Sequence, residues 1–211
     1  MIVFLDTEFT DLVVEPRLLS VGMVTDALYG PELYAEVTDR DRLTTSSRFA
    51  RAVVLPQFGR VDQAACTSAE LGPRLANFFE SLTDTLAQGE FVEIAFGYHL
   101  DWDLVDLAVL DSRDAHWEAT KGWLHPVNVC ELTGFDEGER AAEAYYKTQA
   151  NAAFSQHHAL CDARALRLAY QSVTDNAKPT PLSEQAARST GRLRAGTQAR
   201  RRDPPATASP A

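Results

Sequence analysis

Ile2-Val3-Phe4-Leu5-Asp6-Thr7-Glu8 is the stretch of sequence that decides the fold. Four consecutive apolar residues at the start of the chain are typical of a buried β-strand. Side chains alternate between the two faces of a strand, so the carboxylates of Asp6 and Glu8 point to the same side. Two neighbouring carboxylates repel each other unless a cation or a proton lies between them, although acidic pairs are also common at solvated strand ends.

Hydrophobic periodicity predicts the elements that follow this strand. Further strands are expected at residues 17–25, 32–38, 91–96 and 126–132, with Tyr29-Gly30-Pro31 forming the turn between the first two of these. Helices are expected at residues 75–86, 103–110, 138–149 and 160–173. Three strands followed by alternating helices and strands indicate an α/β domain with a mixed sheet.

The composition favours an ordinary soluble protein. The chain has 211 residues, of which 45% are hydrophobic and 24% are charged. Cys66, Cys130 and Cys161 lie far apart, which argues against a disulfide framework and against a structural zinc site. Because no apolar run reaches the roughly 18 to 20 residues of a membrane span and no signal segment is evident, we expect a cytoplasmic protein that does not act at a membrane.

The charge is divided unevenly along the chain. Residues 178–211 contain seven basic and two acidic residues, a net charge of +5, whereas residues 1–177 carry a net charge of −15. The last segment is also rich in Pro, Ser, Thr and Arg and has no aromatic residue, so we expect one folded domain over residues 1–177 and a disordered tail over 178–211. A solubilising appendage and a contact for nucleic acid through counterion release are both open roles for this tail.

Two later segments place acidic residues at the start of helices. In the segment from Phe96 to Leu104, Asp101 and Asp103 compete for one role, and an N-terminal helix cap would also explain either residue. Near residue 160, His157 and His158 precede an apolar helix that carries Asp162. An acid among small apolar residues is uncommon without a partner, and an ion pair with a nearby arginine such as Arg164 or Arg167 is the alternative explanation.

Together these segments indicate a metal site. Carboxylates at the end of a first strand and on two later helices can converge above one sheet edge, as two divalent ions about 3.5–4 Å apart require. Hard oxygen ligands without cysteine suit Mg²⁺ or Mn²⁺ better than zinc. Such a site suits phosphodiester hydrolysis, and a neutral histidine beside it can accept a proton from the attacking water.

The same residues resemble the motifs of the DEDDh 3'–5' exonuclease superfamily, which includes RNase T, oligoribonuclease and proofreading exonucleases. Phe4-Leu5-Asp6-Thr7-Glu8-Phe9-Thr10 looks like the first motif, and His157-His158-Ala159-Leu160-Cys161-Asp162-Ala163 looks like the third. Residues 97–104 look like the second motif, although His99 stands where an asparagine is frequent. The resemblance spans about residues 2–170, and it is nearest to small bacterial RNase T-like exoribonucleases.

The resemblance implies a role for each matching position. Asp6, Glu8 and Asp162 resemble direct ligands of two metal ions, and His157 resembles the general base. Asp103, chosen over Asp101 because the apolar pattern around it aligns with the second motif, resembles the fourth acid. The resemblance also implies substrate contacts, which are Thr7, Phe9 and Thr10, although core packing explains Phe9 nearly as well.

The family's fold is RNase H-like, with a five-stranded mixed sheet flanked by helices. The resemblance implies an enzyme that uses two Mg²⁺ (or Mn²⁺) ions to remove nucleoside 5'-monophosphates from the 3' ends of RNA or short oligonucleotides. Relatives form dimers, so a homodimer is one expected assembly. A DNA-directed exonuclease of repair or proofreading and a non-catalytic nucleic-acid-binding subunit of the same fold are the alternatives.

Overall fold

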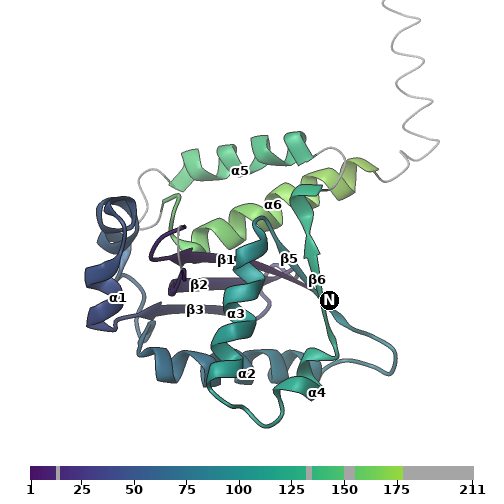
Figure 1. Ribbon diagram of the computed structural model, residues 1–211. Coiled ribbons are helices and arrows are strands. Elements are labelled where there is room, and N and C mark those ends of the chain that lie inside the picture. Colours follow the sequence, from purple (N-terminus) through teal and green to yellow (C-terminus); the bar gives the residue numbers. More distant parts are fainter. Residues whose placement is uncertain (13–14, 132–134, 150–154, 178–211) are drawn as a thin grey trace, which may run out of the picture. The chain divides into compact units, whose positions relative to one another are not determined.

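A six-stranded mixed sheet organises the molecule (Figure 1). The computed structural model describes residues 1–12, 15–131, 135–149 and 155–177. The strand order is β4-β3-β2-β1-β5-β6, where β1 to β3 run antiparallel and the other pairings are parallel. The strands are β1 (Ile2–Phe9), β2 (Leu18–Thr25), β3 (Glu32–Val37), β4 (Ala65–Cys66), β5 (Val92–Phe96) and β6 (Leu124–Asn128).

Helices flank this sheet on both faces. The α-helices are α1 (Arg40–Thr45), α2 (Ser68–Thr83), α3 (His99–Asp111), α4 (Trp117–Lys121), α5 (Phe135–Gln149) and α6 (Ala159–Ala177). The short helical turns are a π-helix, η1 (Ala50–Val54), and two 3₁₀ turns, η2 (Leu55–Gln57) and η3 (Val129–Glu131). Among the described residues, no helix has the length and apolar character needed to span a membrane.

The predicted α/β class and mixed sheet are confirmed, but the expected number of five strands is wrong. The additional strand, β4, has only two residues and pairs with Glu36 and Val37 at the sheet edge, so it leaves no periodic signal in the sequence. The last strand was expected at residues 126–132 but ends at Asn128, where the chain turns into η3. The predicted tail over residues 178–211 lies outside the described part of the chain.

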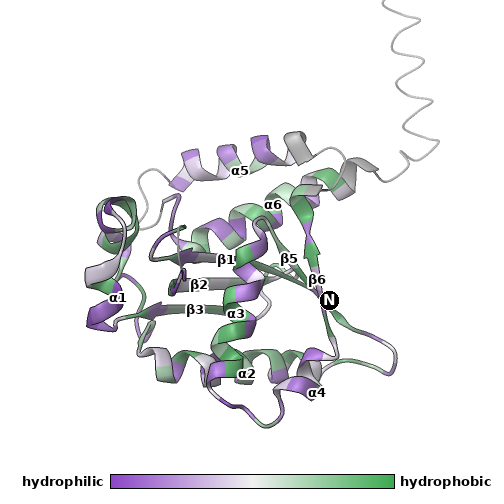
Figure 2. Ribbon diagram, viewed as in Figure 1, coloured by the Kyte–Doolittle hydropathy of each residue, from purple (hydrophilic) through white to green (hydrophobic). Residues whose placement is uncertain are grey.

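Alternation along β1 divides the core into two layers. Val3 and Leu5 belong to the larger apolar cluster, which also contains the apolar side chains of α2 and α3. Phe4 points to the opposite face and packs with Leu160 and Ala163 of α6. In Figure 2, α3 on one face of the sheet and α6 on the other both carry hydrophobic stretches, while the outer helix α5 is largely hydrophilic.

Gly22 brings α6 close to the sheet. It pairs with Asp6 across the antiparallel strands, so both residues face the same side. A Cβ atom at Gly22 would lie 2.3 Å from the backbone carbon of Ala159 and 2.3 Å from the nitrogen of Leu160. Only glycine permits this contact, and the first turn of α6 therefore sits directly beside Asp6.

The end of β1 has a free side. The parallel partner β5 pairs with β1 only from Ile2 to Leu5, so the residues after Leu5 have no strand beside them there. The chain leaves β5 at Phe96 and enters α3 at His99, next to this opening. Open α/β sheets bind ligands in crevices of this kind, at the carboxyl ends of their strands.

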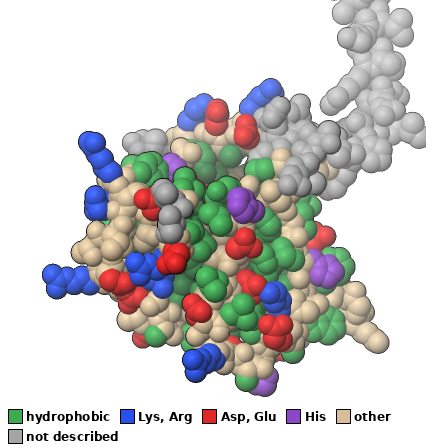
Figure 3. Space-filling view, viewed as in Figure 1, with side chains coloured by type: hydrophobic (Ala, Val, Ile, Leu, Met, Phe, Trp, Pro, Cys, Tyr) green, Lys and Arg blue, Asp and Glu red, His purple; other side chains and the backbone are tan. Residues whose placement is uncertain are grey.

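Charged side chains are unevenly distributed on the surface. Figure 3 shows Lys and Arg side chains gathered on the side of the molecule where α1 lies. The sequence from residue 40 to residue 51 contributes four arginines, namely Arg40, Arg42, Arg48 and Arg51. This basic side contrasts with the negative net charge of residues 1–177.

Candidate metal centre

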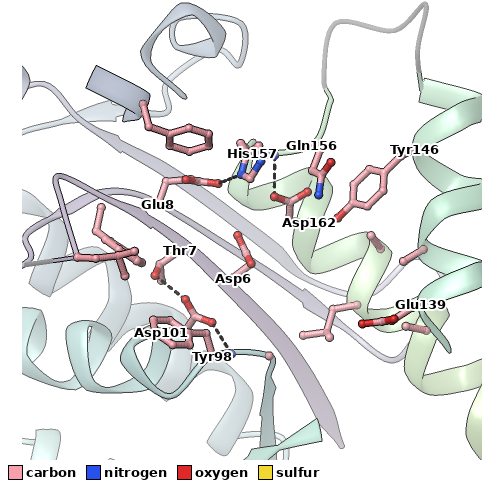
Figure 4. Close-up of a pocket in the computed structure, with 18 of the residues that line it drawn as sticks. Asp6, Thr7, Glu8, Tyr98, Asp101, Glu139, Tyr146, Gln156, His157 and Asp162 are labelled. Atoms are coloured by element: carbon pink, nitrogen blue, oxygen red, sulfur yellow. Dashed lines mark hydrogen bonds and ion pairs between the residues drawn. The ribbon is translucent and has the colours of Figure 1, made fainter. Parts of the chain in front are cut away.

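A cavity of about 590 Å³ lies at the open end of β1. Its walls come from β1, from the segment before η1, from the start of α3, and from α5 and α6. The close-up in Figure 4 shows the labelled polar residues facing one another across this space. The acidic and histidine side chains that line it are Asp6, Glu8, Asp11, Asp101, Glu139, His157 and Asp162.

Strand alternation assigns consecutive residues of β1 to different partners. Asp6 and Glu8 share the face of Phe4, which is the face that α6 covers. Thr7 points to the other face, and its hydroxyl donates a hydrogen bond of 2.7 Å to Oδ1 of Asp101. One short strand end therefore faces acids from two different helices, with Asp6 in the middle of the group (Figure 4).

The structure places Asp101 in this group, whereas the resemblance implies Asp103. Asp101 is buried and lines the cavity, whereas Asp103 is exposed and lies outside it. The helix begins at His99, four residues earlier than expected. Because residues two apart in an α-helix point about 200° apart, only one of the two acids can face the cavity. Asp101 also accepts a hydrogen bond from the backbone N–H of Tyr98, as an acid at the start of a helix commonly does.

Asp162 reaches the site from the first turn of α6. The explanation by an arginine partner is wrong, because Arg164 pairs with Glu32 and Arg167 donates to the backbone carbonyl of Thr25. The Asp162 carboxylate instead accepts a hydrogen bond of 2.8 Å from the backbone N–H of His157. The Tyr146 hydroxyl of α5 points at the same carboxylate (Figure 4).

His157 lies beside Glu8, on the loop just before the first residue of α6. Its Nδ1 lies 3.6 Å from Oε1 of Glu8, and the ring makes an edge-on contact with Phe49 at a centroid distance of 4.9 Å. Its backbone φ of 67° is in the left-handed region, which is uncommon for a residue other than glycine. Ligand atoms of Glu8, His157 and Asp162 all lie within 4.8 Å of one another, close enough to share one metal ion.

His158 has a different role from its neighbour. It is 1% exposed, and its ring stacks on Tyr34 at a centroid distance of 4.4 Å, so it is part of the packed interior. Burial lowers the pKa of His158 to about 4, which keeps the ring neutral. Of the two histidines, only His157 lines the cavity.

Burial and mutual repulsion raise the pKa values of the carboxylates at this site. Burial raises the pKa of Asp6 well above its usual range, and the nearby Asp162, Asp101 and Glu8 raise it further. Burial likewise raises the pKa of Asp101 to about 6 and that of Asp162 to about 7. Glu8, as a hydrogen-bond acceptor, raises the pKa of His157. A bound cation would stabilise the ionised form of every one of these acids.

Unpaired oxygens indicate where cations would bind. Oδ2 of Asp6 and Oδ1 of Asp162 are buried, and neither has a hydrogen-bond partner in the described part of the chain. Buried polar atoms are nearly always paired, so such oxygens call for another ligand. The donor set consists of carboxylate oxygens and one imidazole, which fits Mg²⁺ or Mn²⁺.

The three expected substrate contacts differ in position. Phe9 lines the cavity and stacks on Tyr98 at a centroid distance of 6.4 Å, while also packing against the larger core cluster. Thr7 lines the cavity, but its hydroxyl is engaged by Asp101. Thr10 is buried outside the cavity and accepts a hydrogen bond from the backbone N–H of Arg17, so the structure gives it a role in the local backbone.

Several residues that line the cavity were not predicted from the sequence. Phe49 and Ser47 come from an irregular segment without hydrophobic periodicity, and Tyr146 and Glu139 lie on the hydrophilic helix α5. No local pattern distinguishes these residues from ordinary surface positions, because their relation to the site depends on contacts between distant segments.

Comparison with known proteins adds no relative to this description. The chain matches no model of a known protein family and no curated protein sequence.

Proposed function

We propose that this protein is a metal-dependent 3'–5' exonuclease with an RNase H-like fold that acts on RNA or short oligonucleotides. One observation carries the proposal. Asp6 and Glu8 of β1, Asp101 of α3 and Asp162 of α6 meet with His157 around a single open cavity. Their order along the chain follows the DEDDh motifs, with Asp101 in place of Asp103.

The four carboxylates would hold two Mg²⁺ or Mn²⁺ ions. Asp6 would be the central ligand of this set, because it lies between the other acids and one of its buried oxygens has no hydrogen-bond partner among the described residues. When bound, the ions would lower the pKa of a water molecule and stabilise the charge that develops on the phosphoryl group. Thr7 and the backbone N–H of Tyr98 would hold Asp101 in place for this task.

His157 would act as the general base. It lies beside Glu8 on the loop before α6, and its side chain remains 38% exposed, so a water molecule in the cavity can reach it. A neutral imidazole near this position can take the proton of the attacking water. The stacked rings of Phe9 and Tyr98 offer an aromatic surface on which a terminal base can stack.

The test is the digestion of a 5'-labelled RNA that has a 3' overhang. With Mg²⁺ we expect a ladder that shortens from the 3' end and releases nucleoside 5'-monophosphates, and with EDTA we expect intact RNA. Asp6→Asn should remove the activity, and His157→Ala should lower the rate by roughly 10²–10⁴-fold. A matched DNA overhang in the same assay measures the preference for the sugar.

Two results would contradict the proposal. One is a wild-type protein that binds Mn²⁺ but cleaves neither RNA nor DNA, which would favour a non-catalytic nucleic-acid-binding subunit. The other is cleavage that persists at the wild-type rate in Asp6→Asn, which would point to a contaminating nuclease or to a different site.

A further inference from the structure

Gln57 is a buried amide that makes hydrogen bonds to the loop carrying His157. It lies in η2, about 100 residues earlier in the sequence, and its side chain is 5% exposed. Its Nε2 donates to the carbonyl of His157 at 2.9 Å and to the carbonyl of Gln156 at 3.0 Å. Its Oε1 accepts from the backbone N–H of Ser155 at 3.2 Å and from the Ser155 hydroxyl at 3.1 Å.

These bonds use both ends of the amide on three consecutive residues. The longer contact of Nε2 with the carbonyl of Val53, at 3.3 Å, ties the same side chain to its own segment. A primary amide is required for this arrangement, since it offers a donor and an acceptor side by side. The Gln57 side chain therefore joins η2 to the loop by both donating and accepting hydrogen bonds, as a backbone peptide group does between two strands.

The loop needs such support because the backbone of His157 is strained. The left-handed φ of 67° persists in a residue other than glycine only where the surroundings hold it. Its N–H donates to Asp162 and its carbonyl accepts from Gln57, so both polar groups of this residue are fixed. The direction of the imidazole follows from this backbone conformation.

The imidazole ring of His157 is held by Phe49, which precedes Gln57 in the same part of the chain, and by Glu8 of β1. The ring of Phe49, eight residues before Gln57, packs nearly perpendicular to the His157 imidazole, and Oε1 of Glu8 lies 3.6 Å from Nδ1. Gln57 itself does not line the cavity, so any effect of this residue on the site passes through the loop.

We propose that Gln57 is a positioning residue that holds His157 in its catalytic orientation. This inference rests on the proposed function, since it assigns Gln57 to the placement of the general base. Replacement of Gln57 should lower the rate of the chemical step while substrate binding stays unchanged, because the metal ligands on β1 and α3 keep their places.

The decisive variant is Gln57→Glu, which keeps the size and one acceptor oxygen but places a second oxygen against the carbonyls of Gln156 and His157. We expect kcat to fall by about 10²-fold, the effect of misplacing a reacting group by about 1 Å, while KM changes less than about twofold. Gln63→Glu is the matched control, because it makes the same change on an exposed side chain of the neighbouring segment, and it should behave as the wild type. Gln57→Met, which has similar volume and lacks both hydrogen-bonding groups, serves if Gln57→Glu does not fold.

A second readout is independent of catalysis. Hydrogen exchange of the backbone amides of Ser155 and His157 should become at least about tenfold faster in the Gln57 variants than in the wild type, while the amides of β1 keep their protection. Unchanged exchange at these two amides, or a kcat equal to that of the wild type in an active enzyme, would overturn the inference. If the wild type cleaves no nucleic acid, the proposed function fails and the assignment of Gln57 to catalysis falls with it, whereas a failure of the inference alone leaves the wild type active.

Discussion

At the scale of single residues, Asp101 and Asp103 show how helix phase decides which of two acids faces the cavity. The two carboxylates stand two positions apart in the same apolar helix, yet one is buried against Thr7 and the other is exposed. A carboxylate that holds a metal cannot be replaced by an amide without loss of charge, whereas an exposed one is usually tolerant of this change.

We predict that Asp101→Asn lowers kcat/KM by about 10²-fold or more and that Asp103→Asn stays within about twofold of the wild type. The measurement is the rate of RNA shortening by each variant at a fixed Mg²⁺ concentration. The opposite order of activities would show that Asp103 is the fourth acid, as the resemblance first implied, and that Asp101 serves only as a helix cap.

The pKa of Asp162 leads to a second prediction at this scale. Burial raises this pKa from 3.8 to about 7, so the folded protein without metal binds the proton more tightly than the unfolded chain does. The stabilisation is present at low pH and is lost as the pH rises from about 4 to about 7. In EDTA at about pH 8, Asp162→Asn should therefore melt at least about 4 °C higher than the wild type.

Thermal unfolding in EDTA at about pH 4 and about pH 8 measures this effect, and the difference between the two proteins should shrink at the lower pH. Mg²⁺ should raise the melting temperature of the wild type at about pH 8 and have little effect on Asp162→Asn. If the difference in melting temperature between the two proteins is the same at both pH values, the effect does not come from protonation of Asp162.

The acids of the site and His157 differ in how well the sequence predicts their positions. Asp6 and Glu8 follow a buried run within one strand, so local alternation alone places them together. His157 lies on the loop just before α6, and Asp162 follows five residues later in the first turn of that helix. The choice between Asp101 and Asp103 required the first residue of α3, which is the least reliable feature of a helix prediction.

At the scale of elements, the position of α6 depends on Gly22. The close approach of its first turn to β2 places Asp162 and the His157 loop beside Asp6, and no side chain fits between them. The contact joins two rigid elements through backbone atoms, so a rotamer change cannot relieve a clash there.

We predict that Gly22→Ala destabilises the fold by about 1–3 kcal/mol, the usual cost of overpacking, and lowers activity more than stability alone would explain. The free energy of unfolding in urea and the rate of RNA cleavage below the transition measure these effects. Gly122→Ala is the control, because its nearest contact is 3.3 Å at the end of a short helix. Wild-type stability in Gly22→Ala would show that α6 can move away freely.

Helices and strands with a clear hydrophobic periodicity could be predicted from the sequence, whereas irregular segments could not. The strands near residues 2–9 and 18–25 and the helix α6 carry long apolar patterns, and the structure confirms them. Helix α2 begins at Ser68, seven residues before the expected residue 75, and Thr67 and Glu70 form a capping box at its start. The segment from Arg40 to Gln57 contains three short helices of different type, for which no single period exists.

At the scale of the whole molecule, the acidic charge of residues 1–177 must be reconciled with the polyanionic substrate that we propose. Metal ions at the carboxylates would offset part of the charge locally. The basic side near α1 can supply phosphate contacts (Figure 3). Arg48 is the best placed of these arginines, because it is exposed, stands between the cavity residues Ser47 and Phe49, and has no hydrogen-bond or ion-pair partner among the described residues.

We predict that Arg48→Gln raises KM for an oligonucleotide several-fold and lowers the slope of log KM against log salt by about one, with kcat unchanged. The control is Arg113→Gln, an exposed arginine just beyond the C-terminal end of α3, far from Asp101 at the other end. An equal rise in KM in both variants would mean that the overall charge of the protein determines binding and that Arg48 makes no local contact with the oligonucleotide.

The arrangement of the whole site could not be predicted beyond its motifs. Phe49, Gln57 and Tyr146 reach the site from segments that are distant in sequence, through contacts that only the folded chain defines. The motifs specified which acids were candidates, and the packing of helices on the sheet determined which of them meet.

The alternation along β1 has a consequence for how the chain can evolve. Because Asp6 and Glu8 face α6 while Thr7 between them faces α3, a single inserted or deleted residue in this strand would exchange the two sides. Both acids would then be buried among the apolar side chains of α2 and α3, and Thr7 would stand alone opposite His157. Length changes within this strand should therefore be forbidden even where individual apolar residues can be exchanged freely.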